Sequence, residues 1–237
     1  MGRGDIPPLR SLPRVFLPDI DLEAESFELP REEVEKLRKV LRLGEGDPMA
    51  VLPNDGTLIR CEFRARRAWP VSVEHPNSEP NRRIVLAQAF PKGDRLDTVI
   101  RMGTELGVAE FALFPAERSV VRWDQSKLAD KRRRIDAIVR ESAEQSFRSR
   151  LPEVGFLGSL GEVLEKWPNA QVLSEVETVT AKLERSDEMT LVVGPEGGWA
   201  PRELEAIGGR GVSLGPLVLR TDTAGIAAVA AALLPVV

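Results

Sequence analysis

The amino-acid sequence predicts an α/β protein in which a small β-rich domain precedes a larger domain with a parallel β-sheet. In the first third of the chain, short strand-like runs flank a strong hairpin signal. From residue 83 onward, apolar strand-like runs alternate with helix-like runs, which is typical of a parallel sheet with right-handed crossovers. We therefore expect two domains, at residues 1–78 and 79–237, each long enough to bury a core.

The composition limits the class of protein. Hydrophobic residues make up 42% and charged residues 30% of the 237 positions, as in an ordinary soluble globular protein. Cys61 and His75 are the only residues of their types, so neither an intrachain disulfide nor a multi-histidine metal site can form. The start of the chain has no apolar signal core, and no apolar run approaches the roughly 18 residues of a membrane span. We expect a cytoplasmic protein with no membrane partner.

The charge distribution is uneven, although the net charge is −4. Residues 118–150 carry ten Lys or Arg against five Asp or Glu, whereas residues 151–205 carry four against eleven. An acidic chain can therefore still present a basic face to a nucleic acid. The alternative is that these charges form an ordinary solvated surface.

The first domain is expected to be a β-barrel or sandwich behind a loose extension at Met1–Leu12, which is rich in Gly, Pro and Arg. The turn sequence Asn54-Asp55-Gly56 is typical of a tight hairpin. Two prolines and several polar residues make Val73–Pro80 the expected linker to the second domain. The other predicted elements are a strand at Val15–Leu17, a helix at Arg31–Val40, and strands at Met49–Leu52 and Thr57–Phe63.

The second domain is expected to alternate strands and helices. The predicted strands are Arg83–Phe90, Phe111–Phe114, Gln171–Leu173, Thr190–Val193 and Val212–Leu214. The predicted helices are Arg95–Leu106, which Gly107 would cap, Lys127–Ser146, Glu162–Trp167 and Ala224–Leu234. In a parallel sheet the loops that follow the strands emerge at one carboxyl edge, where ligands bind.

Three loops at that edge indicate a ligand site. Gly194–Trp199 and Leu214–Ala224 contain glycines that let the backbone approach a ligand and prolines that stiffen the loop. Leu173-Ser174-Glu175 is the third loop. The chain has neither a P-loop nor a GxGxxG motif, so we expect a flat, polar small molecule in place of a nucleoside triphosphate or dinucleotide. The alternative is that these loops are ordinary glycine-rich crossovers.

The same loops resemble a known family. Gly194–Trp199 and Leu214–Ala224 closely resemble the C-terminal motifs of the RsmE-type 16S ribosomal RNA uridine N3-methyltransferases, which belong to the SPOUT superfamily of knotted methyltransferases. Phe147 departs from the family pattern, which has a glycine there. Shorter matches are Lys92–Asp94, Thr104–Val108, Glu117–Val121 and Ala143–Ser146.

The resemblance implies a SPOUT-type trefoil knot in residues 79–237 and a PUA-like, RNA-binding β-barrel in residues 1–78. It also implies a homodimer that uses S-adenosylmethionine, without a metal, to methylate 16S ribosomal RNA or the small ribosomal subunit. The cofactor-binding residues it implies are Leu173, Gly194, Pro195, Glu196, Gly197, Leu214, Gly215, Leu219, Thr221 and Ala224. The candidate RNA-binding residues are Arg14, Arg38, Arg42, Arg118 and Arg148, together with Arg132 and Arg133 of the basic ridge on the predicted helix Lys127–Ser146.

Two residues are candidates for the chemistry of this reaction. Uridine N3 is a poor nucleophile until its proton leaves, so a catalyst must favour the imide anion. Arg220 could donate hydrogen bonds to a uracil carbonyl as charge develops there, and Glu196 could accept the proton. The alternative for Arg220 is a structural ion pair with Asp222 or Glu196, and the alternative for Thr221 is the N-cap of the last helix.

Two other functions remain open from the sequence. A non-catalytic RNA-binding or ribosome-assembly protein could keep the fold without turnover. A hydrolase or dehydrogenase on an open α/β sheet is less favoured, because the chain lacks GxSxG and GxGxxG motifs and has one histidine. The basic ridge Lys131–Arg134 fits either RNA binding or a solvated helix face.

Overall fold

A computed structural model describes residues 7–121, 123, 125–176 and 180–234. The chain folds into two compact units, Met1–Glu79 with Ala143–Arg150, and Pro80–Ser142 with Leu151–Val237. The sequence predicted a boundary between residues 78 and 79, and it did not predict that residues 143–150 would join the first unit. Residues 1–6 of the expected loose extension lie outside the described residues, whereas Leu9–Ser11 form a 3₁₀ turn and Leu12 is buried.

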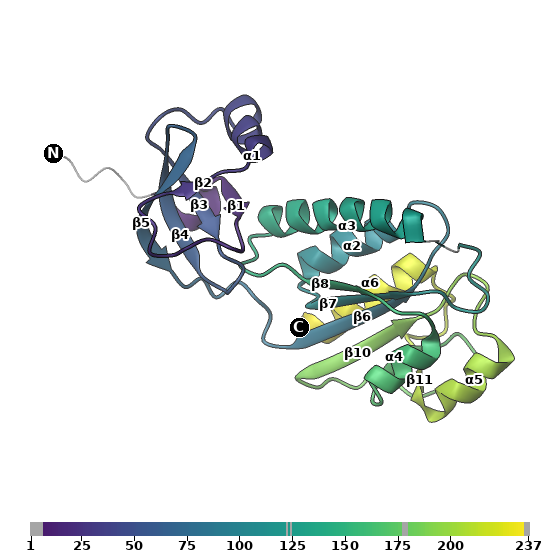
Figure 1. Ribbon diagram of the computed structural model, residues 1–237. Coiled ribbons are helices and arrows are strands. Elements are labelled where there is room, and N and C mark those ends of the chain that lie inside the picture. Colours follow the sequence, from purple (N-terminus) through teal and green to yellow (C-terminus); the bar gives the residue numbers. More distant parts are fainter. Residues whose placement is uncertain (1–6, 122, 124, 177–179, 235–237) are drawn as a thin grey trace. The chain divides into compact units, whose positions relative to one another are not determined.

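The first unit is a curled, mixed five-stranded sheet with the strand order β1-β3-β4-β5-β2 (Figure 1). The strands are β1 (Arg14–Phe16), β2 (Phe27–Glu28), β3 (Asp47–Leu52), β4 (Leu58–Arg64) and β5 (Arg67–Glu74). Only β1 and β3 pair in parallel among the described pairs of this sheet. Helix α1 (Arg31–Glu35) continues as a π-helical turn over Lys36–Val40. The predicted helix and hairpin are therefore present, but β2 and β5 were not predicted.

The hairpin between β3 and β4 follows from local backbone preferences. Asn54 and Gly56 adopt positive φ angles of 73° and 99°, which asparagine and glycine tolerate best. Along β4, Ile59, Cys61 and Phe63 are buried. One predicted boundary is wrong: β5 extends to Glu74, so the first two residues of the expected linker Val73–Pro80 belong to a strand.

The second unit contains a six-stranded parallel sheet with the order β11-β9-β10-β6-β7-β8. Its strands are β6 (Arg83–Ala89), β7 (Glu110–Phe114), β8 (Glu153–Phe156), β9 (Gln171–Leu173), β10 (Glu188–Val193) and β11 (Gly211–Val212). Its helices are α2 (Arg95–Leu106), α3 (Gln125–Gln145, of which residues 143–145 belong to the first unit), α4 (Leu160–Lys166), α5 (Pro201–Ile207) and α6 (Thr221–Leu233). The predicted α/β class with a parallel sheet is confirmed, whereas β8 and α5 were not predicted.

Helices cover both faces of this sheet, so its strands are apolar on both sides. Ile84 and Leu86 of β6 pack in one core with side chains of α2, α3 and α6. Val85 and Ala87 point the other way and pack with side chains of α4 and α5. Figure 1 shows the same three-layer arrangement. Helix α2 ends at Gly107, which has a left-handed φ of 104°, as its sequence predicted.

The strand order places the ends of distant segments together. Strand β10 lies between β6 and β9, and β11 lies on the far side of β9. Because all six strands are parallel, the loops after β9, β10 and β11 leave the same edge of the sheet. This edge is where the sequence predicted a ligand site.

Candidate functional site

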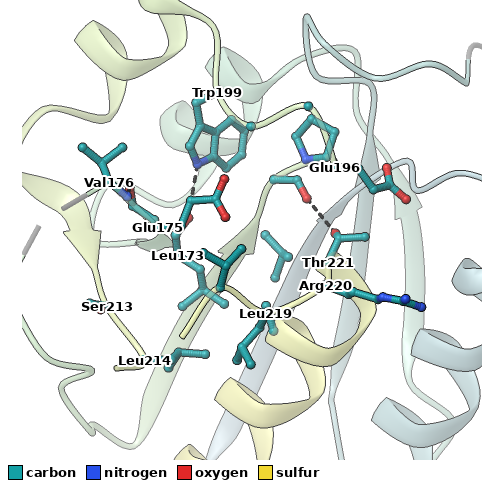
Figure 2. Close-up of a pocket in the computed structure, with 18 of the residues that line it drawn as sticks. Leu173, Glu175, Val176, Glu196, Trp199, Ser213, Leu214, Leu219, Arg220 and Thr221 are labelled. Atoms are coloured by element: carbon teal, nitrogen blue, oxygen red, sulfur yellow. Dashed lines mark hydrogen bonds between the residues drawn. The ribbon is translucent and has the colours of Figure 1, made fainter. Parts of the chain in front are cut away.

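A pocket of about 570 Å³ lies at the carboxyl edge of the second unit's sheet. Its volume is within the range of small-molecule sites. Figure 2 shows that loops after β9, β10 and β11 and the start of α6 surround it. Every residue predicted to bind a cofactor lines it, namely Leu173, Gly194, Pro195, Glu196, Gly197, Leu214, Gly215, Leu219, Thr221 and Ala224. Both predicted catalytic residues, Arg220 and Glu196, also line it.

Trp199 ties two of these loops together. Its Nε1 donates a hydrogen bond to the Leu173 carbonyl oxygen at 3.2 Å (Figure 2). A Cβ added at Gly194 would lie 3.0 Å from the Trp199 ring, closer than van der Waals contact allows. Gly194 is therefore needed so that the buried indole can pack against the turn that leaves β10.

The other glycines of these loops have different reasons to be glycine. Gly198 and Gly215 adopt positive φ angles of 67° and 130°. A Cβ at Gly197 would lie 3.1 Å from Cβ of Arg118, whose Nη1 donates a hydrogen bond to the Gly197 carbonyl at 3.2 Å. A side chain at position 197 would therefore crowd Arg118.

Glu196 is held at the pocket by two donors. Its Oε1 accepts hydrogen bonds from the Lys92 backbone N–H at 3.0 Å and from Arg95 Nη1 at 3.1 Å. Arg95, the first residue of α2, also lines the pocket. Arg95 was not predicted as a site residue, although it directly follows the matched stretch Lys92–Asp94.

Arg220 is exposed at the pocket and stands at the N-cap of α6. Within the described residues, neither an ion pair nor a hydrogen bond of its side chain is present. The alternative ion pair with Glu196 is not formed, because Arg95 is the partner of that carboxylate. Asp222 is not a partner either, and its Oδ1 is buried without a hydrogen bond in the described structure. The Arg220 guanidinium is thus available to a ligand.

Thr221 is buried and is the first residue of α6. Its Oγ1 donates a hydrogen bond to the Gly194 carbonyl oxygen at 2.7 Å (Figure 2) and accepts one from Gln88 Nε2 at 2.9 Å. The alternative role of Thr221 as a helix N-cap is therefore wrong, because its hydroxyl bonds to other segments and Arg220 holds the cap position. Gln88 was missed, although a lone amide in the apolar run Ile84–Phe90 was a visible signal.

Two of the arginines predicted to bind RNA are buried within the first unit. Arg14 donates a hydrogen bond to the Leu9 carbonyl at 2.8 Å and lies 4.1 Å from the centre of the Phe147 ring. Burial lowers the pKa of Arg14 to about 10. The Arg148 guanidinium donates to Glu79 Oε2 at 2.8 Å and 3.1 Å, and its side chain is 5% exposed. These contacts give both arginines a structural role.

Phe147, where the resemblance in the sequence predicted a glycine, has a left-handed backbone conformation. It adopts a left-handed φ of 64°, which glycine reaches more easily than phenylalanine does. Its ring packs against the Arg14 guanidinium, with Arg10 5.8 Å from the ring centre. Aromatic contact with cations therefore offsets part of the backbone cost at this position.

The remaining predicted RNA contacts are exposed. Arg38 pairs with Glu45 at 2.8 Å, and Arg42 has no ion pair among the described residues. Arg118 lines the pocket and therefore lies at the candidate site itself. In the ridge Lys131–Arg134, each of the three arginines pairs with an aspartate, namely Asp136, Asp130 and Asp97. These pairs reduce the net charge of the ridge, which favours a solvated helix face.

No cluster of three or more His, Cys, Asp and Glu side chains in the described part of the chain is placed to hold a metal ion. No described helix is long and apolar enough to cross a membrane.

Comparison with known proteins shows the family to which this chain belongs. Residues 77–233 match the family profile described as RNA methyltransferase domain. The ribosomal RNA small subunit methyltransferase E of Bacillus subtilis strain 168 is 33% identical over 230 residues, covering 88% of this chain and 90% of the relative. The chain belongs to the ribosomal RNA small subunit methyltransferase E family. The resemblance found in the sequence is thereby confirmed.

Solved structures agree with this assignment over nearly the whole chain. The ribosomal RNA small subunit methyltransferase E of Neisseria gonorrhoeae, solved bound to S-adenosyl methionine, superposes with a TM-score of 0.82 at 29% identity, covering 93% of this chain and 96% of that one. A Legionella pneumophila protein solved in complex with the bound cofactor SAM superposes with a TM-score of 0.84 at 28% identity and the same coverage.

Proposed function

We propose that this protein transfers a methyl group from S-adenosylmethionine to N3 of a uridine in 16S ribosomal RNA of the small subunit. The observation that carries the proposal is the convergence of three loops on one pocket with a free arginine, Arg220, at its rim. Family membership supports the same reaction. The pocket also favours catalysis over a purely RNA-binding role, because every residue expected to hold the cofactor lines it.

The residues of the pocket fit S-adenosylmethionine. Leu173, Leu214 and Leu219 offer apolar surface to an aromatic base, while the loop backbone offers amides and carbonyls. Glu175 is exposed at the pocket and has no ion pair or hydrogen bond among the described residues, so it can meet hydroxyls or a positive charge. When bound, S-adenosylmethionine supplies an electrophilic methyl group. The protein must hold the methyl group and the uridine N3 in line, and this alignment needs no metal.

Arg220 and Glu196 would act on the uracil. Arg220 donates hydrogen bonds to a uracil carbonyl oxygen and stabilises the negative charge that develops when the N3 proton leaves. Glu196 accepts that proton through Oε2, because Oε1 already accepts from Lys92 and Arg95. Arg95 then orients the carboxylate.

Several further features belong to this proposal. We expect the C-terminal segment to thread into a trefoil knot, which the hydrogen bond from Thr221 to the Gly194 carbonyl would stabilise. We expect the first unit to act as a PUA-like RNA-binding domain through its exposed Arg38 and Arg42. A homodimer and a cytoplasmic site of action are further expectations, and light scattering of the purified chain would test the first.

The test is a methyl-transfer assay with the purified chain. Small subunits and 16S ribosomal RNA from cells without this activity would be incubated with labelled S-adenosylmethionine, with a chelator present, and digested to nucleosides. We expect labelled 3-methyluridine, and we expect Glu196→Gln to reduce its formation. Binding of S-adenosylmethionine without any transfer to either substrate would instead support the non-catalytic RNA-binding alternative.

A further inference from the structure

Gln88 is a buried amide that reaches the pocket only through other residues. Its side chain has 0% exposure, and it does not line the cavity. Its Nε2 donates hydrogen bonds to Thr221 Oγ1 at 2.9 Å and to the Ala89 carbonyl at 3.1 Å. Because Thr221 Oγ1 donates onward to the Gly194 carbonyl at 2.7 Å, a chain of hydrogen bonds joins β6, α6 and the loop after β10.

The number of available protons determines which group donates in each of these hydrogen bonds. A threonine hydroxyl has one proton, and here it goes to the Gly194 carbonyl oxygen. The lone pairs of Thr221 Oγ1 then need a donor, which the amide nitrogen of Gln88 supplies. An apolar side chain at position 88 would leave the buried hydroxyl without that donor. The hydroxyl could then rotate away from Gly194.

The environment of Gln88 indicates that packing alone does not explain it. Its Oε1 has no hydrogen-bond partner in the described structure, and buried acceptors of this kind are few in native proteins. An apolar residue would avoid that cost in the middle of a core. Gly225 leaves the space for this oxygen, since a Cβ there would lie 3.1 Å from Gln88 Oε1 and 3.4 Å from Val193 Cγ2.

We infer that Gln88 is a positioning residue of the methyltransferase site. Through Thr221 it fixes the carbonyl of Gly194 and holds the loop Gly194–Gly198 against the start of α6. Both Gly194 and Thr221 line the pocket, and Arg220 is the residue next to Thr221. Gln88 therefore sets the geometry that the cofactor and the catalytic arginine require. This inference rests on the proposed function, because it concerns the same site.

A double-mutant cycle on the full chain tests the inference. Gln88→Met keeps the length of the side chain and removes its amide, and Thr221→Val keeps the shape and removes the hydroxyl. S-adenosylmethionine affinity would be measured by calorimetry, the single-turnover methyl-transfer rate with ribosomal RNA, and the melting temperature in parallel. Thr221→Ser restores the hydroxyl. Gln171→Met is the matched control, because Gln171 of β9 bonds to Glu184 and not to the pocket.

We expect Gln88→Met to weaken S-adenosylmethionine binding about tenfold, which is the scale of one lost hydrogen bond that supports the bound geometry. On the Thr221→Val background the same change should have little further effect, because the two residues act as one unit. Thr221→Ser, which keeps the hydroxyl, should bind S-adenosylmethionine more tightly than Thr221→Val does, and Gln171→Met should leave affinity unchanged. If Gln88→Met does not fold, Gly225→Ala replaces it and should weaken binding by pressing on Gln88.

Equal losses from Gln88→Met on both backgrounds would overturn the inference, as would a lowered melting temperature with wild-type affinity and rate. If neither Gln88→Met nor Gly225→Ala changed affinity while the wild type bound S-adenosylmethionine, this inference alone would be refuted. If the wild-type chain did not bind S-adenosylmethionine, the proposed function would fall and this inference with it.

Discussion

Gly194→Ala should disturb the pocket through Trp199. The new Cβ would lie 3.0 Å from two carbons of the indole, and Trp199 is buried at 7% exposure, so the ring has little room to move. Gly194 does not have a positive φ, so alanine can adopt its backbone conformation, and the cost is steric. Overpacking of a core costs about 1–3 kcal/mol, and loss of the bond from Trp199 to Leu173 adds about 1 kcal/mol.

The reduced freedom of the unfolded alanine chain returns about 0.4–1 kcal/mol, which leaves a net loss of about 1–3.6 kcal/mol. Urea denaturation would measure it, and the NMR signal of the Trp199 indole N–H would report whether the bond to Leu173 survives. Gly209→Ala is the matched control, because no atom lies within 4 Å of its added Cβ. Wild-type stability of Gly194→Ala, with an unshifted indole signal, would refute the packing argument.

Three further predictions concern single side chains. Arg220→Ala should slow single-turnover methyl transfer about 10²- to 10³-fold at saturating cofactor and RNA, with partial recovery at high pH; an unchanged rate would remove its catalytic role. Phe147→Gly should be about 1 kcal/mol more stable to urea than Phe147→Ala, because both lose the ring that packs on Arg14 but alanine keeps the strain at φ 64°. Burial raises the pKa of the Cys61 thiol from 9.0 to about 12, so the thiol stays protonated to a higher pH in the folded state than in the unfolded state. Its contribution to stability is present below pH 9 and is lost as pH rises toward 12, at up to about 1.4 kcal/mol per pH unit; urea denaturation of wild type and Cys61→Ala should differ in this slope.

Local patterns in the sequence were enough to predict many elements. Helix α2 was predicted with its observed bounds, Arg95–Leu106, because its apolar face repeats with the helical period and Gly107 supplies a left-handed cap. Strand β9 was likewise predicted at Gln171–Leu173. Glycine and proline after apolar strands also marked the loops that line the pocket at the carboxyl edge of the sheet, since parallel strands bring such loops together.

Short or irregular elements were harder to predict. Strand β8 and helix α5 span four and seven residues, too few to show a clear period. The sequence also placed the start of α6 at Ala224, three residues late, because Thr221 resembles a capping residue. Its hydroxyl instead forms hydrogen bonds with Gln88 of β6 and with the Gly194 carbonyl after β10, and a local motif cannot reveal such distant partners.

The sequence by itself determined the family, the parallel α/β class and the loops that line the pocket, because these depend on motifs and on periodicities within a few residues. Only the tertiary structure decided which side chains within those loops remain free. Arg95 takes the carboxylate of Glu196, and Arg220 is left available, although 101 residues separate the first pair. Arg14 and Arg148 likewise make buried contacts that only the packed chain brings about. Burial and hydrogen-bond partners are properties of the packed chain, since they depend on segments that the strand order alone brings together.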